Sequence, residues 1–134
     1  MPAARILIVD DDTQVLGLYM RILAGRGLTV TGTISGLDAL AAAADSHFDV
    51  AVIDLSMPDI DGFEILKTLH RNLPGLKIVV MSGVMPGVLL NSAGLFGAAA
   101  TLQKPVSPEA FIGAVEALIH SRSASAGSGA QSSI

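Results

Sequence analysis

Short apolar runs rich in β-branched residues alternate with segments of helical periodicity along most of this chain. The runs are typical of strands buried on both faces, and they occupy residues 5–9, 28–33, 49–54, 77–81 and about 98–102. The helical segments occupy residues 12–25, 37–44, 62–72, a stretch within 86–96, and about 108–121. Parallel strands need crossover connections, which helices supply. The sequence therefore predicts an α/β fold: a doubly wound, five-stranded parallel sheet with five helices.

Local signals mark the ends of several predicted helices. Asp12 or Thr13 can cap the first helix, and Gly25 ends its apolar pattern. The last helix has Ser107 as its cap, followed by Pro108 at the first helical position, where proline is well tolerated. These signals agree with the alternation of strands and helices.

Composition favours one folded, acidic domain. Of the 134 residues, 51% are hydrophobic and 15% charged, far from the composition of disordered chains. A net charge of −4 and an aromatic content of 4% argue against direct nucleic-acid binding. The absence of cysteine excludes disulfides, thiolate metal sites and cysteine nucleophiles.

The composition changes near the carboxyl end of the sequence. After residue 121 the chain is dominated by Ser, Ala and Gly, which bury too little apolar area to offset the entropy of ordering. We expect a folded domain over residues 1–121 and a flexible tail or linker over residues 122–134. The apolar run at residues 6–9 is too short for a signal or membrane segment, so we expect a cytoplasmic protein without membrane association.

Polar residues follow four of the predicted strands. Asp10 and Asp11 follow the first strand, Asp54 ends the third, Ser82 follows the fourth and Lys104 the fifth. Because binding sites of open α/β sheets form at the carboxyl ends of the strands, we expect these groups to converge.

Clustered carboxylates repel one another unless a cation shares their site. Mg²⁺ prefers oxygen ligands, which Asp11 and Asp54 can supply, with Asp10 acting through water; Mn²⁺ could substitute. An aspartate can attack phosphorus to form an acyl phosphate when nearby cations neutralise the developing charge. Asp54 is the candidate nucleophile, Lys104 a candidate cation and Ser82 a candidate hydroxyl donor.

The motifs ILIVDDD, VIDLSMPDIDGFE, VVMSG and LQKP occur in this order, and with them residues 4–121 resemble the response-regulator receiver family of two-component signalling. The resemblance implies a flavodoxin-like, chemotaxis-regulator-like fold with strand order 2-1-3-4-5. It implies Asp10 and Asp11 as the acidic pair for Mg²⁺, Asp54 as phosphoacceptor and Ser82 as the switch hydroxyl.

The resemblance also implies that Lys104 contacts the phosphoryl group. It further implies two backbone features: the carbonyl of Ser56 is a metal ligand, and the peptide bond between Lys104 and Pro105 is cis. The implied function is a switch, not an enzyme: it takes a phosphoryl group from a sensor histidine kinase or phosphotransfer protein. It then acts on a downstream protein or on an output domain outside this chain.

Two positions depart from the family pattern. Thr101 stands where the family often has a switching aromatic residue, and Gly83 follows the switch hydroxyl. Ser56 and Val84 stand where the family often tunes hydrolysis, and neither carries a carboxylate or amide. We therefore expect slow self-dephosphorylation, with a lifetime of minutes or longer.

Other interpretations remain open. A degenerate receiver could act as a constitutive binding adaptor. A Mg²⁺-dependent phosphohydrolase is disfavoured because Ser56 replaces the second acid such enzymes commonly use. The uncharged stretch over residues 84–96 is either core or a partner surface, and a homodimer would form through the face of the fourth and fifth helices.

Overall fold

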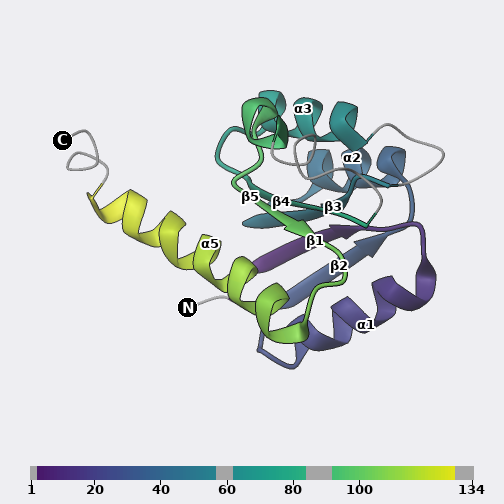
Figure 1. The fold of residues 1–134 in the computed structure, drawn as a ribbon. Coiled ribbons are helices and arrows are strands. Elements are labelled where there is room, and N and C mark those ends of the chain that lie inside the picture. Colours follow the sequence, from purple (N-terminus) through teal and green to yellow (C-terminus); the bar gives the residue numbers. More distant parts are fainter. Residues whose placement is uncertain (1–2, 57–61, 84–91, 129–134) are drawn as a thin grey trace.

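The computed structural model describes residues 3–56, 62–83 and 92–128 (Figure 1). A parallel five-stranded sheet forms its centre, with strand order β2-β1-β3-β4-β5. The strands are β1 (Arg5–Val9), β2 (Thr29–Thr33), β3 (Val50–Asp54), β4 (Lys77–Ser82) and β5 (Ala100–Gln103). The predicted α/β class and strand order are confirmed.

Helices cover both faces of this sheet. The described helices are α1 (Thr13–Ala24), α2 (Gly36–Asp45), α3 (Gly62–Asn72), α5 (Pro108–Ser128) and the short 3₁₀-helix η1 (Ser92–Phe96). In Figure 1, α1 and α5 lie on one face, and α2 and α3 lie on the other. The layers are those of a doubly wound sheet, as predicted.

Two hydrophobic clusters fill the spaces between the sheet and its helices. Alternate residues of each central strand point to opposite faces, so Ile6 and Ile8 join one cluster while Leu7 and Val9 join the other. The strands β1 and β3 are almost wholly buried because helices cover them on both sides. Phe111 of α5 is fully buried and stacks on Tyr19 of α1, with ring centroids 4.4 Å apart.

The predicted helix caps are present. The Asp12 side chain accepts hydrogen bonds from the backbone N–H groups of Gln14 and Val15 at the start of α1. The Ser107 hydroxyl accepts one from the N–H of Ala110, in the first turn of α5. Capping places the start of α1 directly after the acidic residues that follow β1.

Gly62 begins α3 at a point of close backbone approach. A Cβ atom at this position would lie 2.8 Å from Leu55 Cα, so only glycine fits without displacing the chain that follows Asp54. Gly62 thereby lets α3 begin against the residue next to the candidate nucleophile.

Several predicted boundaries differ from the structure. The fifth strand begins at Ala100, two residues later than predicted, because its pairing starts with Val79 opposite Ala100. Of the fourth helix predicted within residues 86–96, only the part from Ser92 is described, and it is a 3₁₀-helix. The remainder, together with Val84 and most of the loop predicted over residues 55–61, lies outside the described residues.

The last helix crosses the boundary predicted at residue 121. Its backbone is helical to Ser128, seven residues beyond 121, and residues 129–134 lie outside the described part. A division between a folded domain and a flexible tail stays a prediction. No helix within the described residues is both long enough and apolar enough to cross a membrane.

Candidate functional site at the carboxyl edge of the sheet

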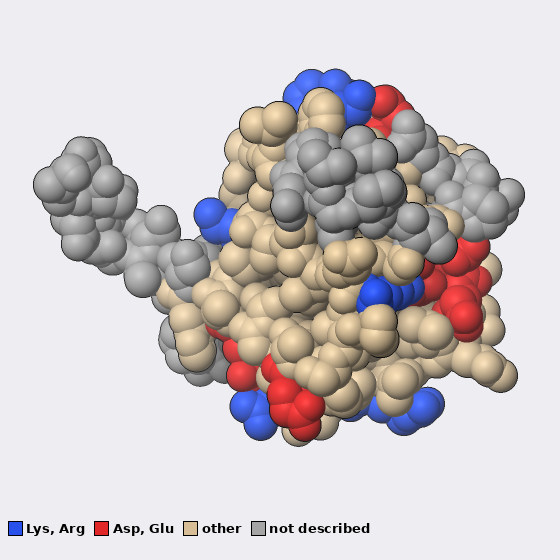
Figure 2. All heavy atoms as spheres, viewed as in Figure 1, with Lys and Arg blue, Asp and Glu red and all other residues tan. Residues whose placement is uncertain are grey.

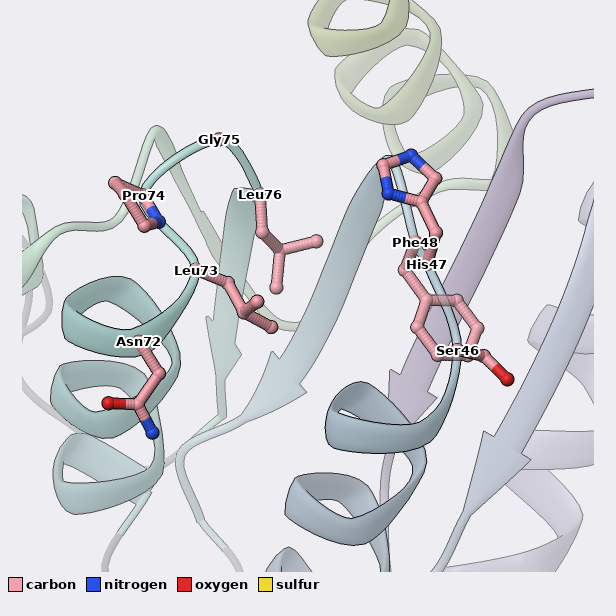
Figure 3. Close-up of a pocket in the computed structure, with 8 residues that line it drawn as sticks. All are labelled: Ser46, His47, Phe48, Asn72, Leu73, Pro74, Gly75 and Leu76. Atoms are coloured by element: carbon pink, nitrogen blue, oxygen red, sulfur yellow. The ribbon is translucent and has the colours of Figure 1, made fainter.

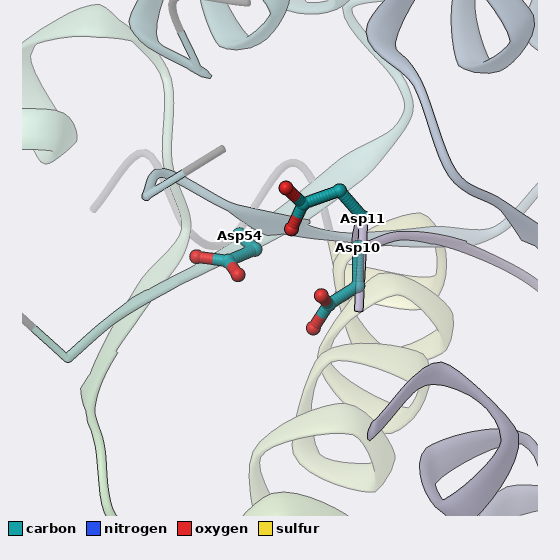
Figure 4. Close-up of side chains that lie close together, drawn as sticks. All are labelled: Asp10, Asp11 and Asp54. Carbon is teal, nitrogen blue, oxygen red and sulfur yellow. The ribbon is translucent and has the colours of Figure 1, made fainter. Parts of the chain in front are cut away.

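Three carboxylates meet where β1 and β3 end. These strands are parallel neighbours with Val9 opposite Ile53, so the residues that follow, Asp10 and Asp54, come side by side. One oxygen from each of Asp10, Asp11 and Asp54 lies within 4.8 Å of the others, and Figure 4 shows the three side chains turned toward a common space. Asp10 and Asp54 are buried while Asp11 is exposed, so the cluster is open on one side.

Both carboxylate oxygens of Asp54 have hydrogen-bond donors. The backbone N–H of Ser56 donates to Oδ1 at 2.8 Å, and the Lys104 ammonium donates to Oδ2 at 3.2 Å. Asp54 is 5% exposed, so its orientation is fixed inside the protein rather than in solvent. The structure thus holds Asp54 in place beside a positive charge.

Lys104 reaches this position from the end of β5. Its backbone N–H donates to the carbonyl of Ser82 at 2.9 Å, extending the β4–β5 ladder by one residue, and the bond to Pro105 is cis. Its ammonium nitrogen lies 3.8 Å from Asp10 Oδ2 as well as beside Asp54. Burial alone would lower the pKa of Lys104, but the two carboxylates together raise it, which keeps the ammonium charged.

Asp10 has an incomplete set of partners. Its Oδ1 accepts a hydrogen bond from the N–H of Asp12 at 2.9 Å, whereas its buried Oδ2 has no hydrogen-bond partner among the described residues. Burial raises the pKa of the Asp10 carboxyl, the Asp12 N–H lowers it, and the charge of Asp54 raises it again. The charged form of Asp10 is therefore destabilised without a further cation.

The donor set fits a hard divalent cation. Oxygens on opposite sides of Mg²⁺ lie about 4 Å apart, twice the Mg–O distance. One oxygen from each of the three carboxylates lies within 4.8 Å of the other two, so all three could contribute to a single ion. A cation there would give the unpartnered Asp10 Oδ2 a partner and offset the repulsion among the acids. The exposed side at Asp11 leaves room for the waters that Mg²⁺ usually keeps.

Two serine hydroxyls meet next to the ends of β3 and β4. Ser82, the last residue of β4, is fully buried, and its Oγ lies 2.9 Å from the Oγ of Ser56. The resemblance implied that the Ser56 carbonyl is a metal ligand and that its side chain stands at a position that often tunes hydrolysis. No sequence signal pointed to the contact between the two hydroxyls. Thr101 lies within β5 opposite Val80, two residues before the position paired with Ser82.

A hollow of about 450 Å³ opens next to Lys104. It lies between the start of α1 and the β5–α5 connection, and its lining residues are Val15, Tyr19, Gly83, Lys104, Pro105 and Val106. Tyr19 was not predicted as a residue of the site, because its only sequence signal is a place on the core face of the first helix. Figure 2 shows a small basic patch directly beside a larger acidic one on a mostly uncharged face. The hollow gives Lys104 a route to solvent.

A second pocket, of about 260 Å³, lies at the opposite edge of the sheet (Figure 3). It is formed by the segments that precede β3 and β4, and it includes His47, whose ring nitrogen lies 3.1 Å from Asp49 Oδ1. Both segments enter their strands at the amino end, whereas the acidic cluster lies at the carboxyl end. This pocket is therefore separate from the chemistry of Asp54.

Comparison with known proteins agrees with this geometry. Residues 6–116 match the family model described as the response regulator receiver domain. The chain is similar to the "DNA-binding transcriptional regulator NtrC" of Salmonella typhimurium, with 34% identity over 85% of this chain and 24% of that protein. It is also similar to "Protein PilG" of Pseudomonas aeruginosa, with 29% identity over 87% of this chain and 88% of that one.

Solved structures give the same result. A CheY-like response regulator receiver domain protein from Methanospirillum hungatei has a TM-score of 0.87 and 30% identity, over 91% of this chain and 98% of that one. The Vibrio cholerae chemotaxis response regulator CheY4 has a TM-score of 0.80 and 26% identity, over 87% and 99% of the two chains. The chain spans less than a third of the length of relatives such as NtrC and a protein-glutamate methylesterase.

Proposed function

This chain belongs to the response regulator receiver domain family, and from that premise we propose that it is a phosphorylation-controlled switch with Asp54 as its phosphoacceptor. Receiver domains are regulatory modules of two-component signalling. The observation that carries the assignment to Asp54 is its fixed carboxylate, held between the Ser56 N–H and the Lys104 ammonium and beside Asp10 and Asp11.

The proposed reaction is a transfer of one phosphoryl group. A carboxylate oxygen of Asp54 attacks phosphorus, a new O–P bond forms, and the bond from phosphorus to the donor's nitrogen or oxygen breaks with its electron pair leaving on the donor. Lys104 lies close enough to Asp54 to neutralise charge on the phosphoryl oxygens, and the Ser82 hydroxyl can donate a hydrogen bond to one of them. The hollow beside Lys104 is the route we propose for the donor.

Mg²⁺ is the cofactor we propose, with Mn²⁺ as a substitute. Asp10, Asp11 and Asp54 would hold it, together with the backbone carbonyl of Ser56. When bound, the ion supplies positive charge that stabilises the transferring phosphoryl group. The unpartnered Oδ2 of Asp10 is the structural support for this assignment.

The proposed partners follow from the same chemistry. The donor is a sensor histidine kinase or phosphotransfer protein in the cytoplasm, and the recipient of the signal is a downstream protein or an output domain of a longer protein. We propose no direct nucleic-acid or membrane contact. A homodimer through the face of the fourth and fifth helices stays a proposal. Slow self-dephosphorylation also stays a proposal, and it rests on Ser56 and Val84 standing at sequence positions that often tune hydrolysis in the family.

Intact-mass measurement tests the assignment. Wild-type protein incubated with Mg²⁺ and acetyl phosphate should gain the mass of one phosphoryl group, and Asp54→Asn should gain none. Asp45→Asn removes an exposed acid at the end of α2 and should behave as wild type. Continuous phosphate release without accumulation would indicate a phosphohydrolase. No gain in any variant would indicate a constitutive adaptor.

A further inference from the structure

The hydrogen bond between the hydroxyls of Ser56 and Ser82 joins two residues that belong to different strand ends. Leu55 extends the β3–β4 ladder, because its N–H donates to the carbonyl of Met81 at 2.8 Å. Ser56 follows with its N–H bound to Asp54 Oδ1 at 2.8 Å. These two backbone bonds hold the Ser56 side chain over the end of β4, where its Oγ lies 2.9 Å from that of Ser82.

We propose that the Ser56 hydroxyl is a positioning group, which holds the Ser82 hydroxyl in its resting place until Asp54 is phosphorylated. The inference rests on the proposed function, because it requires Ser82 to exchange its bond with Ser56 for one with the phosphoryl group. Ser56 thereby sets the balance between the resting and the phosphorylated arrangements of the site.

Hydrogen-bond chemistry supports this exchange. Either hydroxyl can be the donor in the bond between Ser56 and Ser82. A serine hydroxyl has one proton to donate, so in the arrangement in which Ser82 donates to Ser56 that proton is not available to another acceptor. Phosphorylation adds charged acceptor oxygens at the neighbouring Asp54, and bonds to charged oxygens are stronger than bonds between neutral hydroxyls. Ser82 is fully buried, so bulk water does not take the place of Ser56 in the resting state.

The size of the effect of the Ser56 hydroxyl on the switching equilibrium can be estimated. A bond made in only one of two states shifts their equilibrium by its own net free energy. For a neutral hydrogen bond inside a protein this corresponds to a factor of about two to ten. Removing the Ser56 hydroxyl should therefore favour the phosphorylated arrangement by about two- to tenfold.

Equilibrium binding of beryllofluoride, a phosphoryl mimic that attaches to carboxylates, tests the proposal. The probe is titrated into the Mg²⁺-loaded full chain and followed by amide shifts in NMR spectra, which avoids any effect of Ser56 on hydrolysis rates. Ser56→Ala keeps the backbone N–H and carbonyl and should bind beryllofluoride about two- to tenfold more tightly than wild type. Ser56→Thr keeps a hydroxyl and should stay near the wild-type affinity.

A double-mutant cycle separates positioning from a general structural effect. In the Ser82→Ala background the partner hydroxyl is absent, so adding Ser56→Ala should leave the beryllofluoride affinity unchanged. Equal or weaker binding by Ser56→Ala in the wild-type background, or an equal gain in both backgrounds, would overturn the proposal while leaving the function intact. If wild type itself binds no beryllofluoride, the proposed function fails and this inference fails with it.

Discussion

Replacing Asp10 by Asn should stabilise the metal-free protein, because Asp10 is a buried acid and its Oδ2 has no hydrogen-bond partner among the described residues. At an effective dielectric of 20, repulsion from Asp54, whose carboxylate oxygen lies within 4.8 Å, costs at least about 3 kcal/mol, and the Lys104 ammonium at 3.8 Å contributes about 4 kcal/mol in the other direction. These charge interactions nearly cancel, so the burial of Oδ2 decides the sign. Removing the buried charge at Oδ2 should raise the free energy of unfolding of Asp10→Asn above that of wild type by about 1–3 kcal/mol.

The pH dependence of this gain follows from the direction of the pKa shift. Burial raises the pKa of Asp10 in the folded protein above its ordinary value of 3.8, so the folded state holds the proton more tightly than the unfolded state. The contribution of the protonated Asp10 carboxyl to wild-type stability is therefore lost as pH rises from 3.8 through the raised pKa. Asp10→Asn should escape this loss, so its advantage is complete at neutral pH and disappears below the ordinary pKa.

Mg²⁺ should reduce or reverse the difference in unfolding free energy between Asp10→Asn and wild type. At a free concentration one hundred times its Kd, a ligand stabilises the folded state by about 2.7 kcal/mol. Wild type should gain this amount, while Asp10→Asn lacks one of the proposed acidic ligands and should gain less. Urea unfolding followed by far-ultraviolet circular dichroism, in EDTA and then in Mg²⁺, measures both differences.

Asp12→Asn is the matched control. Asn caps helices as well as Asp does, and Asp12 is exposed outside the carboxylate cluster, so its unfolding free energy should stay within about 0.5 kcal/mol of wild type. The reasoning is refuted if Asp10→Asn is no more stable than wild type in EDTA, or if both proteins gain equally from Mg²⁺.

Three other substitutions test the packing and an ion pair of the fold, each by urea unfolding. Phe111→Ala should cost about 3–5 kcal/mol, because its fully buried ring is removed; a cost below about 1 kcal/mol would contradict this packing. Gly97→Ala should cost at least about 1–3 kcal/mol, since φ is +114° and the new Cβ would meet the His70 ring; a second change, His70→Ala, should restore only part of the loss. Glu116→Gln should be less stable than wild type at neutral pH, because the hydrogen bond from Arg26 lowers the pKa of Glu116. That stabilisation is present above the ordinary carboxyl pKa and lost as pH falls through the lowered one, so an unchanged difference in acid would contradict it.

The convergence of the site could be predicted because it depends on strand ends alone. Once residues 5–9 and 49–54 are recognised as parallel neighbours, Asp10 and Asp54 must share an edge whatever their rotamers. The same holds for Lys104, which directly follows the fifth strand. The strand order came from the family motifs, since alternation of strands and helices is compatible with several orders.

Contacts between side chains could not be predicted in the same way. The bond between Ser56 and Ser82 depends on the path of the chain after Asp54 and on two rotamers, and neither has a sequence pattern. The unpartnered oxygen of Asp10 likewise depends on where Asp12 and Lys104 place their donors. The start of the fifth strand was placed too early because residues 98–99 are alanines, which continue an apolar run without indicating where pairing begins.

The central claim is that Asp54 itself becomes an acyl phosphate. Borohydride reduces an aspartyl phosphate to homoserine, so trapping after incubation with acetyl phosphate, followed by peptide mass spectrometry, locates the modified residue. We predict homoserine at position 54 in the presence of Mg²⁺ and a strong reduction of the signal in EDTA. Homoserine at another aspartate, with position 54 unmodified, would contradict the account.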